Sequence, residues 1–276
     1  MLYNSLEIKN VYTNYLNELK ESTPLDDAMK ELAGSLEGFD EIGKRQLNIL
    51  RYYGLEPHHH LIEVGCGSGR LAKQLSPYLT GMYSGFDIID EAVDYASKLV
   101  QRPDWTFESI DYISIPEPDG CADMVCFFSV FTHLLNEEIY FYLEEAIRVL
   151  KPGGKIVFSF LEFSETHHGR QFFELVNDVK LQKVKPITVY GNREEIAVWA
   201  KHLILDIEDF RDGSDLRFGT DNWESICVLS APKLTPYEPI QATPQTRGIR
   251  KLALKILPHG TRRHRVVRYL YRLFKS

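Results

Sequence analysis

The sequence predicts an α/β fold, with a doubly wound, seven-stranded and mostly parallel sheet covered by helices on both faces. Between residues 61 and 161, short apolar runs alternate with helix-forming segments, which is the rhythm of βαβ units. The first apolar run ends in glycines at alternate positions, Gly65, Gly67 and Gly69, and a helix-forming segment follows. The predicted core strands are 61–64, 82–86, 105–108, 122–128 and 155–161, and the core helices are 70–79, 90–101 and 136–150.

The flanking segments follow the same patterns. Leucines and tyrosines at helical spacing predict a helix over residues 2–20 and another over 40–53, with a helix or loop between them. Asn192 is placed to cap a helix that begins at Arg193. The remaining predicted elements are helices at 171–179 and 193–202 and strands at 203–210 and 224–230, which complete the sheet.

The glycine turn after the first strand is suited to a nucleotide-shaped cofactor. A ligand can approach the backbone closely only where no Cβ intervenes, and glycine also permits the positive φ that such a turn requires. Asp87 stands at the carboxyl end of the second strand, where an acid about 20 residues beyond the turn accepts ribose hydroxyls in dinucleotide folds.

The spacing of the glycines separates two cofactor classes. Dinucleotide turns have the pattern G-x-G-x-x-G, whereas this turn has G-x-G-x-G. Together with Glu63 and the later Lys-Pro-Gly-Gly at 151–154, the pattern resembles the class I S-adenosylmethionine-dependent methyltransferases. The landmarks that share the family's order are 63–69, Asp87, Asp111, 123–129 and 148–154.

This resemblance covers about residues 46–230. It implies a Rossmann-like sheet that ends in an antiparallel hairpin, and S-adenosyl-L-methionine as the cofactor. We therefore expect a helical lid or substrate-recognition segment at 1–45, the methyltransferase core at 46–230, a Pro-rich linker at 231–247 and a basic helical tail at 248–276.

The resemblance also implies which residues hold the cofactor. Glu63 and the backbone of the glycine turn would hold its methionine portion, Asp87 the ribose and Ile88 the adenine. The other residues implied are Gly65, Cys66, Gly67 and Gly69 in the turn, Asp111 and Tyr112 at the adenine edge, and Phe128 and Ser129 beneath the sulfonium. The alternatives are that Glu63 and Asp87 cap neighbouring helices and that Tyr112 and Phe128 are ordinary core.

Methyl transfer from a sulfonium is a direct displacement, so alignment dominates catalysis. Alignment contributes roughly 7–11 kcal/mol, and a general base adds about 10²- to 10⁴-fold. His133, just after the fourth strand, is the first candidate base for a hydroxyl acceptor, although it could instead only shape its loop. His167 and His168, in a loop after the fifth strand, are the second choice. No metal site is predicted, and the histidines at 58–60 precede the first strand at the sheet's amino end.

Composition favours a soluble enzyme. The chain has 276 residues, 44% hydrophobic and 12% aromatic, which excludes disorder as its main state. Its cysteines, at 66, 121, 126 and 227, form no C-x-x-C pair and are expected to be reduced thiols of a cytoplasmic protein. Neither an export signal nor a membrane span is expected.

Charge divides the chain into an acidic body and a basic tail. Residues 1–238 carry a balance of −17, whereas 239–276 carry ten basic residues and no acid. Within 248–276, two segments place apolar and basic residues on opposite sides of a helix, as an interfacial anchor on an anionic membrane does. Nucleic acid, another subunit and the chain's own domain are the alternative partners of the tail.

The sequence thus predicts a methyltransferase that acts on a small-molecule or lipid-linked acceptor, at a hydroxyl of a sugar or secondary metabolite. The alternatives are an RNA or protein methyltransferase that uses the basic tail, and a non-catalytic cofactor-binding subunit. No Asn-Pro-Pro-Tyr or Asp-Pro-Pro-Tyr segment, the signature of base-amino methylation, occurs in the chain. This ranks the nucleic-acid alternative second.

Overall fold

The computed structural model describes residues 5–181, 188–218 and 224–233. The chain divides into two compact units, Met1–Leu234 and Thr235–Ser276, and all of the second unit lies outside the described residues. The tail helices expected within 248–276 therefore stay a prediction. None of the helices in the described part is both long and apolar enough to cross a bilayer.

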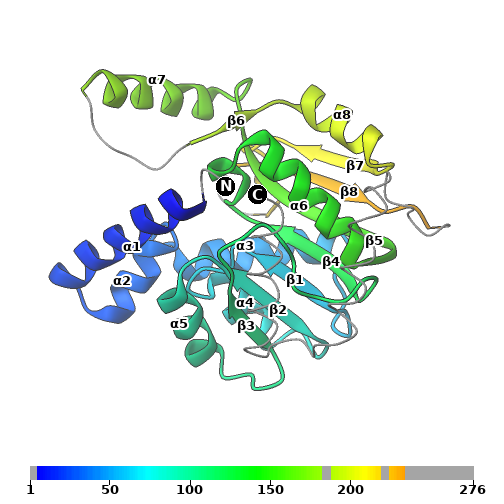
Figure 1. The fold of residues 1–276 in the computed structure, drawn as a ribbon, viewed down its shortest axis with the longest axis horizontal. Coiled ribbons are helices and arrows are strands. Elements are labelled where there is room, and N and C mark those ends of the chain that lie inside the picture. Colours follow the sequence, from blue (N-terminus) through cyan, green and yellow to red (C-terminus); the bar gives the residue numbers. More distant parts are fainter. Residues whose placement is uncertain (1–4, 182–187, 219–223, 234–276) are drawn as a thin grey trace, which may run out of the picture. The chain divides into compact units, whose positions relative to one another are not determined.

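One sheet forms the centre of the first unit (Figure 1). Its strands are β1 (Leu61–Val64), β2 (Tyr83–Asp87), β3 (Thr106–Ser109), β4 (Ala122–Phe127), β5 (Leu150–Glu162), β7 (Asp206–Arg211) and β8 (Ser225–Ser230), with the two-residue β6 (Tyr190–Gly191) beside β5. The order is β3-β2-β1-β4-β5-β8-β7. β8 runs antiparallel to both β5 and β7, whereas the other neighbouring strands in this order are parallel to each other. The predicted mostly parallel sheet with an antiparallel terminal hairpin is confirmed.

Helices cover both faces of the sheet. They are α1 (Ser5–Ser22), α2 (Leu25–Leu32), α3 (Phe39–Tyr52), α4 (Arg70–Leu75), α5 (Asp90–Val100), α6 (Asn136–Val149), α7 (Thr166–Lys180) and α8 (Arg193–His202), with short 3-10 turns η1 (Phe131–His133) and η2 (Leu216–Phe218). Apolar residues of α3 and α4 pack with the strands in one core cluster. On the opposite face, Tyr142 of α6 contacts Phe127 of β4. Figure 1 shows α6 in front of the sheet and α3 behind it.

The largest departure from the predicted elements concerns α7. The sequence predicts an extended loop at residues 164–169 and a helix only from Gln171. This is wrong, since the helix begins at Thr166 and the Gly169 amide donates to the carbonyl of Glu165 within its first turn. A glycine near a helix end costs only about 1 kcal/mol. His167 and His168 therefore lie on a helix.

Candidate cofactor and acceptor site

The three glycines of the turn after β1 have different surroundings. All three have positive φ, at +81° for Gly65, +50° for Gly67 and +86° for Gly69. A Cβ at Gly65 would collide with Val130, and one at Gly69 would lie 2.9 Å from the Cβ of Ala96 in α5. A Cβ at Gly67 would meet nothing within 4 Å. Gly65 and Gly69 thus allow close packing, whereas Gly67 borders the open space that a cofactor laid against the turn would occupy.

Asp87 ends β2 beside this turn. Its Oδ2 accepts a hydrogen bond from the Gly67 amide at 2.7 Å, and its Oδ1 accepts one from the Ile89 amide at 2.9 Å. Burial raises the pKa of the Asp87 carboxyl, although these amide hydrogen bonds lower it in part. The Ile88 amide contributes a further hydrogen bond. A carboxylate has about four acceptor positions, so about one remains for a ribose hydroxyl. The residues present therefore fit the ribose of the expected cofactor.

Glu63 lies deeper than Asp87. Its side chain is only 3% exposed, and one carboxylate oxygen accepts a hydrogen bond from the Tyr83 hydroxyl at 2.5 Å. Burial raises the pKa of Glu63 to about 7. Glu63 is thus held by Tyr83, and its role toward the methionine portion stays a prediction.

The residues expected at the adenine are more exposed than Glu63. The Ile110 amide donates to the carbonyl of Asp87 at 2.8 Å, which brings the segment after β3 alongside Asp87. Asp111 is exposed, and Tyr112 and Ile88 are partly exposed. All three are accessible to a ligand, so the adenine contacts that the resemblance implies for them stay predictions.

A hydrogen-bonded group that the sequence did not predict surrounds Ser129 at the end of β4. Ser129 has a positive φ of 58°, and its amide donates to the Ser159 hydroxyl at 2.7 Å. The hydroxyls of Ser129 and Ser159 both donate to the carboxylate of Glu224, which precedes β8. Phe128, in contrast, is 6% exposed and packs in the core cluster with α3 and α4. Since Glu224 is 95 residues from Ser129, no local spacing could have indicated this contact.

Helix α1 contacts His133, the first candidate base. The Tyr12 hydroxyl of α1 lies 2.9 Å from Nε2 of His133, and the two rings are edge to face at 5.6 Å. Burial, followed by the negative charges of Asp87 and Glu224, raises the pKa of Tyr12 to about 12. Tyr12 is therefore protonated at neutral pH. From the sequence, Tyr12 is expected either to stack on a sugar or aromatic ring of the acceptor or to pack in a lid helix, and its contact with His133 was not predicted.

The second-choice histidines have different surroundings. His167 is exposed on α7. His168 is 1% exposed, and its Nδ1 accepts a hydrogen bond from the Glu162 amide at 2.9 Å. Glu162 in turn forms an ion pair with Arg193 of α8 at 2.9 Å. Among these three histidines, His133 is the one that contacts Tyr12 of α1.

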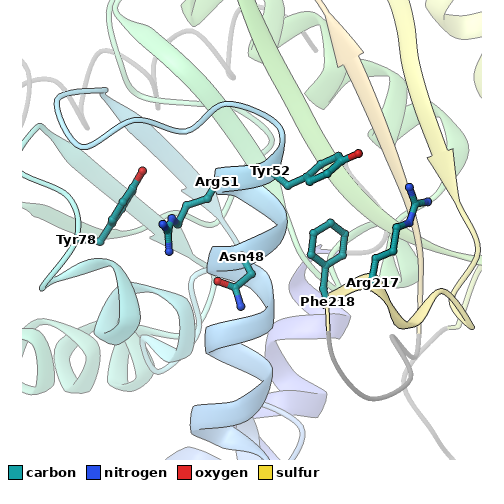
Figure 2. Close-up of a pocket in the computed structure, with 6 residues that line it drawn as sticks. All are labelled: Asn48, Arg51, Tyr52, Tyr78, Arg217 and Phe218. Carbon is teal, nitrogen blue, oxygen red and sulfur yellow. The ribbon is translucent and has the colours of Figure 1, made fainter.

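A shallow hollow of about 570 Å³ lies elsewhere, over the last turns of α3. Figure 2 shows Arg51 and Tyr78 on one side of that helix and Tyr52, Phe218 and Arg217 on the other. Beneath it, the guanidinium of Arg211, 2% exposed, stacks on the rings of Tyr52 and Phe218 at 4.4 and 4.5 Å. None of the residues expected to hold the cofactor lines this hollow.

One group of possible metal ligands stands at the start of the sheet. Glu56, His58 and His59 bring their ligand atoms within 4.8 Å of one another at the protein surface. Nδ1 of His59 already accepts a hydrogen bond from the Glu56 amide at 3.1 Å. That hydrogen bond favours the tautomer that carries its proton on Nε2, which is unsuited to bind a cation. The expectation that no metal is used stays a prediction.

Comparisons with known proteins show which family the core of the chain is similar to. Residues 62–158 match the model of the methyltransferase domain family. The chain is 25% identical to a 27-O-demethylrifamycin SV methyltransferase of Amycolatopsis mediterranei over 152 residues, which are 54% of this chain and 50% of that protein. It is 29% identical to a sterol 24-C-methyltransferase of Gibberella zeae over 124 residues, 43% of this chain and 32% of that one. The chain thus spans half or less of the length of these curated relatives.

Solved structures show the same fold. Magnesium protoporphyrin IX methyltransferase from Synechocystis, with bound S-adenosylhomocysteine, aligns with a TM-score of 0.57 at 13% identity and covers 83% of this chain and all of that one. Phosphoethanolamine N-methyltransferase 1 of Haemonchus contortus, also with S-adenosylhomocysteine, aligns with a TM-score of 0.59 at 13% identity, over 91% of this chain and 56% of that one.

The glycine turn, the acid at the end of β2 and the sheet order define a nucleotide-binding α/β domain. Residues 62–158 match the methyltransferase domain family, and the fold is that of solved S-adenosylmethionine-dependent methyltransferases. The cofactor of such a domain is S-adenosyl-L-methionine.

Proposed function

We propose that this chain transfers a methyl group from S-adenosylmethionine to a hydroxyl of a small-molecule acceptor, such as a sugar or secondary metabolite. The observation that supports the proposal most is the Tyr12–His133 pair, which joins the lid helix to η1 just after β4. Ligands of open α/β sheets bind beyond the carboxyl ends of the strands, where η1 lies. The relatives named for rifamycin and sterol methylation agree with a small-molecule acceptor.

The cofactor would lie along the glycine turn. Gly67 leaves room for it, Asp87 would accept the ribose hydroxyls, and Ser129 would lie near the reacting end. When bound, the cofactor supplies an electrophilic methyl group on a sulfonium. The protein's task is to hold the acceptor atom in line with that group and to exclude water.

His133 is proposed to remove the acceptor's proton. As the acceptor oxygen would form its bond to the methyl carbon and the carbon–sulfur bond would break, Nε2 of His133 would take up the hydroxyl proton. In this structure the Tyr12 hydroxyl lies 2.9 Å from that nitrogen, where an acceptor hydroxyl would have to lie. Tyr12 keeps its own proton because its pKa is about 12. Acceptor binding would therefore displace the Tyr12 side chain from His133, and α1, which carries Tyr12, would have to shift with it.

The test is methyl transfer from labelled S-adenosylmethionine to three separate pools, namely hydroxyl-bearing small molecules, RNA and protein. We expect label in the first pool, with turnover at least about 10²-fold lower in His133→Ala and cofactor affinity nearly unchanged. Label only in RNA or protein would replace the proposal with the alternative acceptors. Cofactor binding with no transfer to any pool would favour a non-catalytic subunit.

We also propose that the basic tail holds this cytoplasmic enzyme at an anionic membrane surface. The support is compositional, because residues 239–276 carry ten basic residues and no acid, with apolar residues at helical spacing. Binding to anionic vesicles should fall sharply on removal of the tail and in the double variant Leu270→Glu, Phe274→Glu. If the intact chain does not bind these vesicles at low salt but shifts RNA in a gel, the membrane proposal is wrong.

A further inference from the structure

Four aromatic side chains gather where β5 ends and α7 begins, and we call them the aromatic surface. They are Phe163, Phe172, Phe173 and Tyr190. The ring centroid of Phe163 lies 5.0 Å from that of Phe172 and 4.9 Å from that of Tyr190. Phe172 also contacts Tyr190 at 5.5 Å and Phe173 at 5.7 Å. These distances are those of interacting aromatic rings, so the four side chains form one continuous cluster.

Much of this cluster faces solvent. Phe163 is 52% exposed and Phe173 is 67% exposed, and further along α7 Val179 is 74% exposed. His168 is the only buried residue of the 15-residue α7. Figure 1 shows α7 extending outward from the β5–β6 end of the sheet. A helix that exposes this much apolar surface beside a site is typical of a ligand-binding region.

The backbone links the aromatic surface directly to the candidate base. Tyr190 lies opposite Leu161, near the end of β5, in the β5–β6 pair. The neighbouring Val189 amide donates to the carbonyl of Thr132 at 2.8 Å, and His133 is the next residue. The aromatic surface and His133 are thus held at the same, carboxyl edge of the sheet.

We propose that the aromatic surface binds the apolar body of the acceptor while the hydroxyl to be methylated reaches His133. This inference rests on the proposed function and names the acceptor as amphipathic, with an apolar chain or fused rings attached to a hydroxyl-bearing part. An aromatic side chain offers about 150–250 Å², and these four are partly covered by one another. The exposed area is enough for a small molecule but short of the roughly 800 Å² per partner of a stable protein interface.

The test uses octyl and decyl β-D-glucosides below their micelle concentrations, titrated by calorimetry into the full chain saturated with S-adenosylhomocysteine. Each buried methylene contributes about 0.8 kcal/mol, which is about a fourfold change in affinity. Decyl glucoside should therefore bind up to about 15-fold more tightly than octyl glucoside. Phe173→Asp should weaken decyl binding at least about tenfold and remove the dependence on chain length. Phe163→Ser should act in the same direction.

Val198→Asp is the matched control, because Val198 is 52% exposed on a different helix, α8. It should leave both affinities unchanged. Wild-type binding that is absent or independent of chain length, or equal losses in Val198→Asp and Phe173→Asp, would overturn the inference. The inference would also be overturned if sedimentation shows that the wild type self-associates and that Phe173→Asp makes it monomeric, while glucoside binding is unaffected. Failure of wild type to bind S-adenosylhomocysteine would instead overturn the proposed function.

Discussion

Replacement of Asp87 by asparagine is the most direct test of the cofactor site. The variant keeps the shape of the side chain and one carbonyl oxygen, so one of the two amide contacts, to Gly67 at 2.7 Å or to Ile89 at 2.9 Å, can persist. It removes the carboxylate charge that we expect the ribose hydroxyls to meet. A hydrogen bond to a charged group contributes about 1.5–3 kcal/mol, so affinity for S-adenosylmethionine should fall about 13- to 160-fold.

The assay is isothermal calorimetry with S-adenosylmethionine and S-adenosylhomocysteine, and both should lose affinity alike because they share the ribose. Asp94→Asn is the control, since it makes the same charge change at an exposed position of α5. Urea unfolding of both variants separates a weakened turn from a lost ligand contact. Unchanged affinity in a folded Asp87→Asn protein would refute the assignment. NADH that binds more tightly than S-adenosylhomocysteine would refute the interpretation of the glycine turn.

Three further outcomes are expected. Tyr12→Phe should keep cofactor affinity and change turnover by no more than about tenfold, because one neutral hydrogen bond contributes about 0.5–1.5 kcal/mol. If turnover in the same transfer assay instead falls as far as in His133→Ala, Tyr12 itself is essential to the chemistry. Burial raises the pKa of Glu63 from 4.5 to about 7 in the folded state. The free energy of unfolding of the cofactor-free wild type should therefore fall by up to about 3 kcal/mol, relative to that of Glu63→Gln, as pH rises from 4.5 to 7. Urea titrations that give a pH-independent difference between the two proteins would contradict this. A chain that ends at Leu234 should fold and bind S-adenosylhomocysteine in calorimetry with the affinity of the full chain. Aggregation or lost binding would mean that the first unit needs the second for its stability.

Caps and turns were predicted from the sequence because residues that are close together in the chain determine them. The helix at 193–202 has the predicted bounds, because the Asn192 side chain accepts a hydrogen bond from the Glu195 amide at 2.8 Å, within the same turn. The turn from β1 to α4 follows from glycines, which adopt these positive φ values without the strain that a side chain would add. The start of α7 was predicted five residues too late, because the helix begins at Thr166 and continues through Gly169.

The sequence by itself determined the parallel sheet, the glycine turn, the acid that follows it and hence the cofactor class. It did so because strand alternation, turn conformation and motif spacing are all set by residues near one another in the chain. Only the tertiary structure brought Tyr12 to His133 across 121 residues and Glu224 to Ser129 across 95, and gathered the aromatic surface from two separate segments. Such contacts depend on how helices and strands pack, and packing is selected by the whole core. Thus the sequence indicated the methyl donor, whereas the residues proposed to receive the acceptor were assembled by the fold.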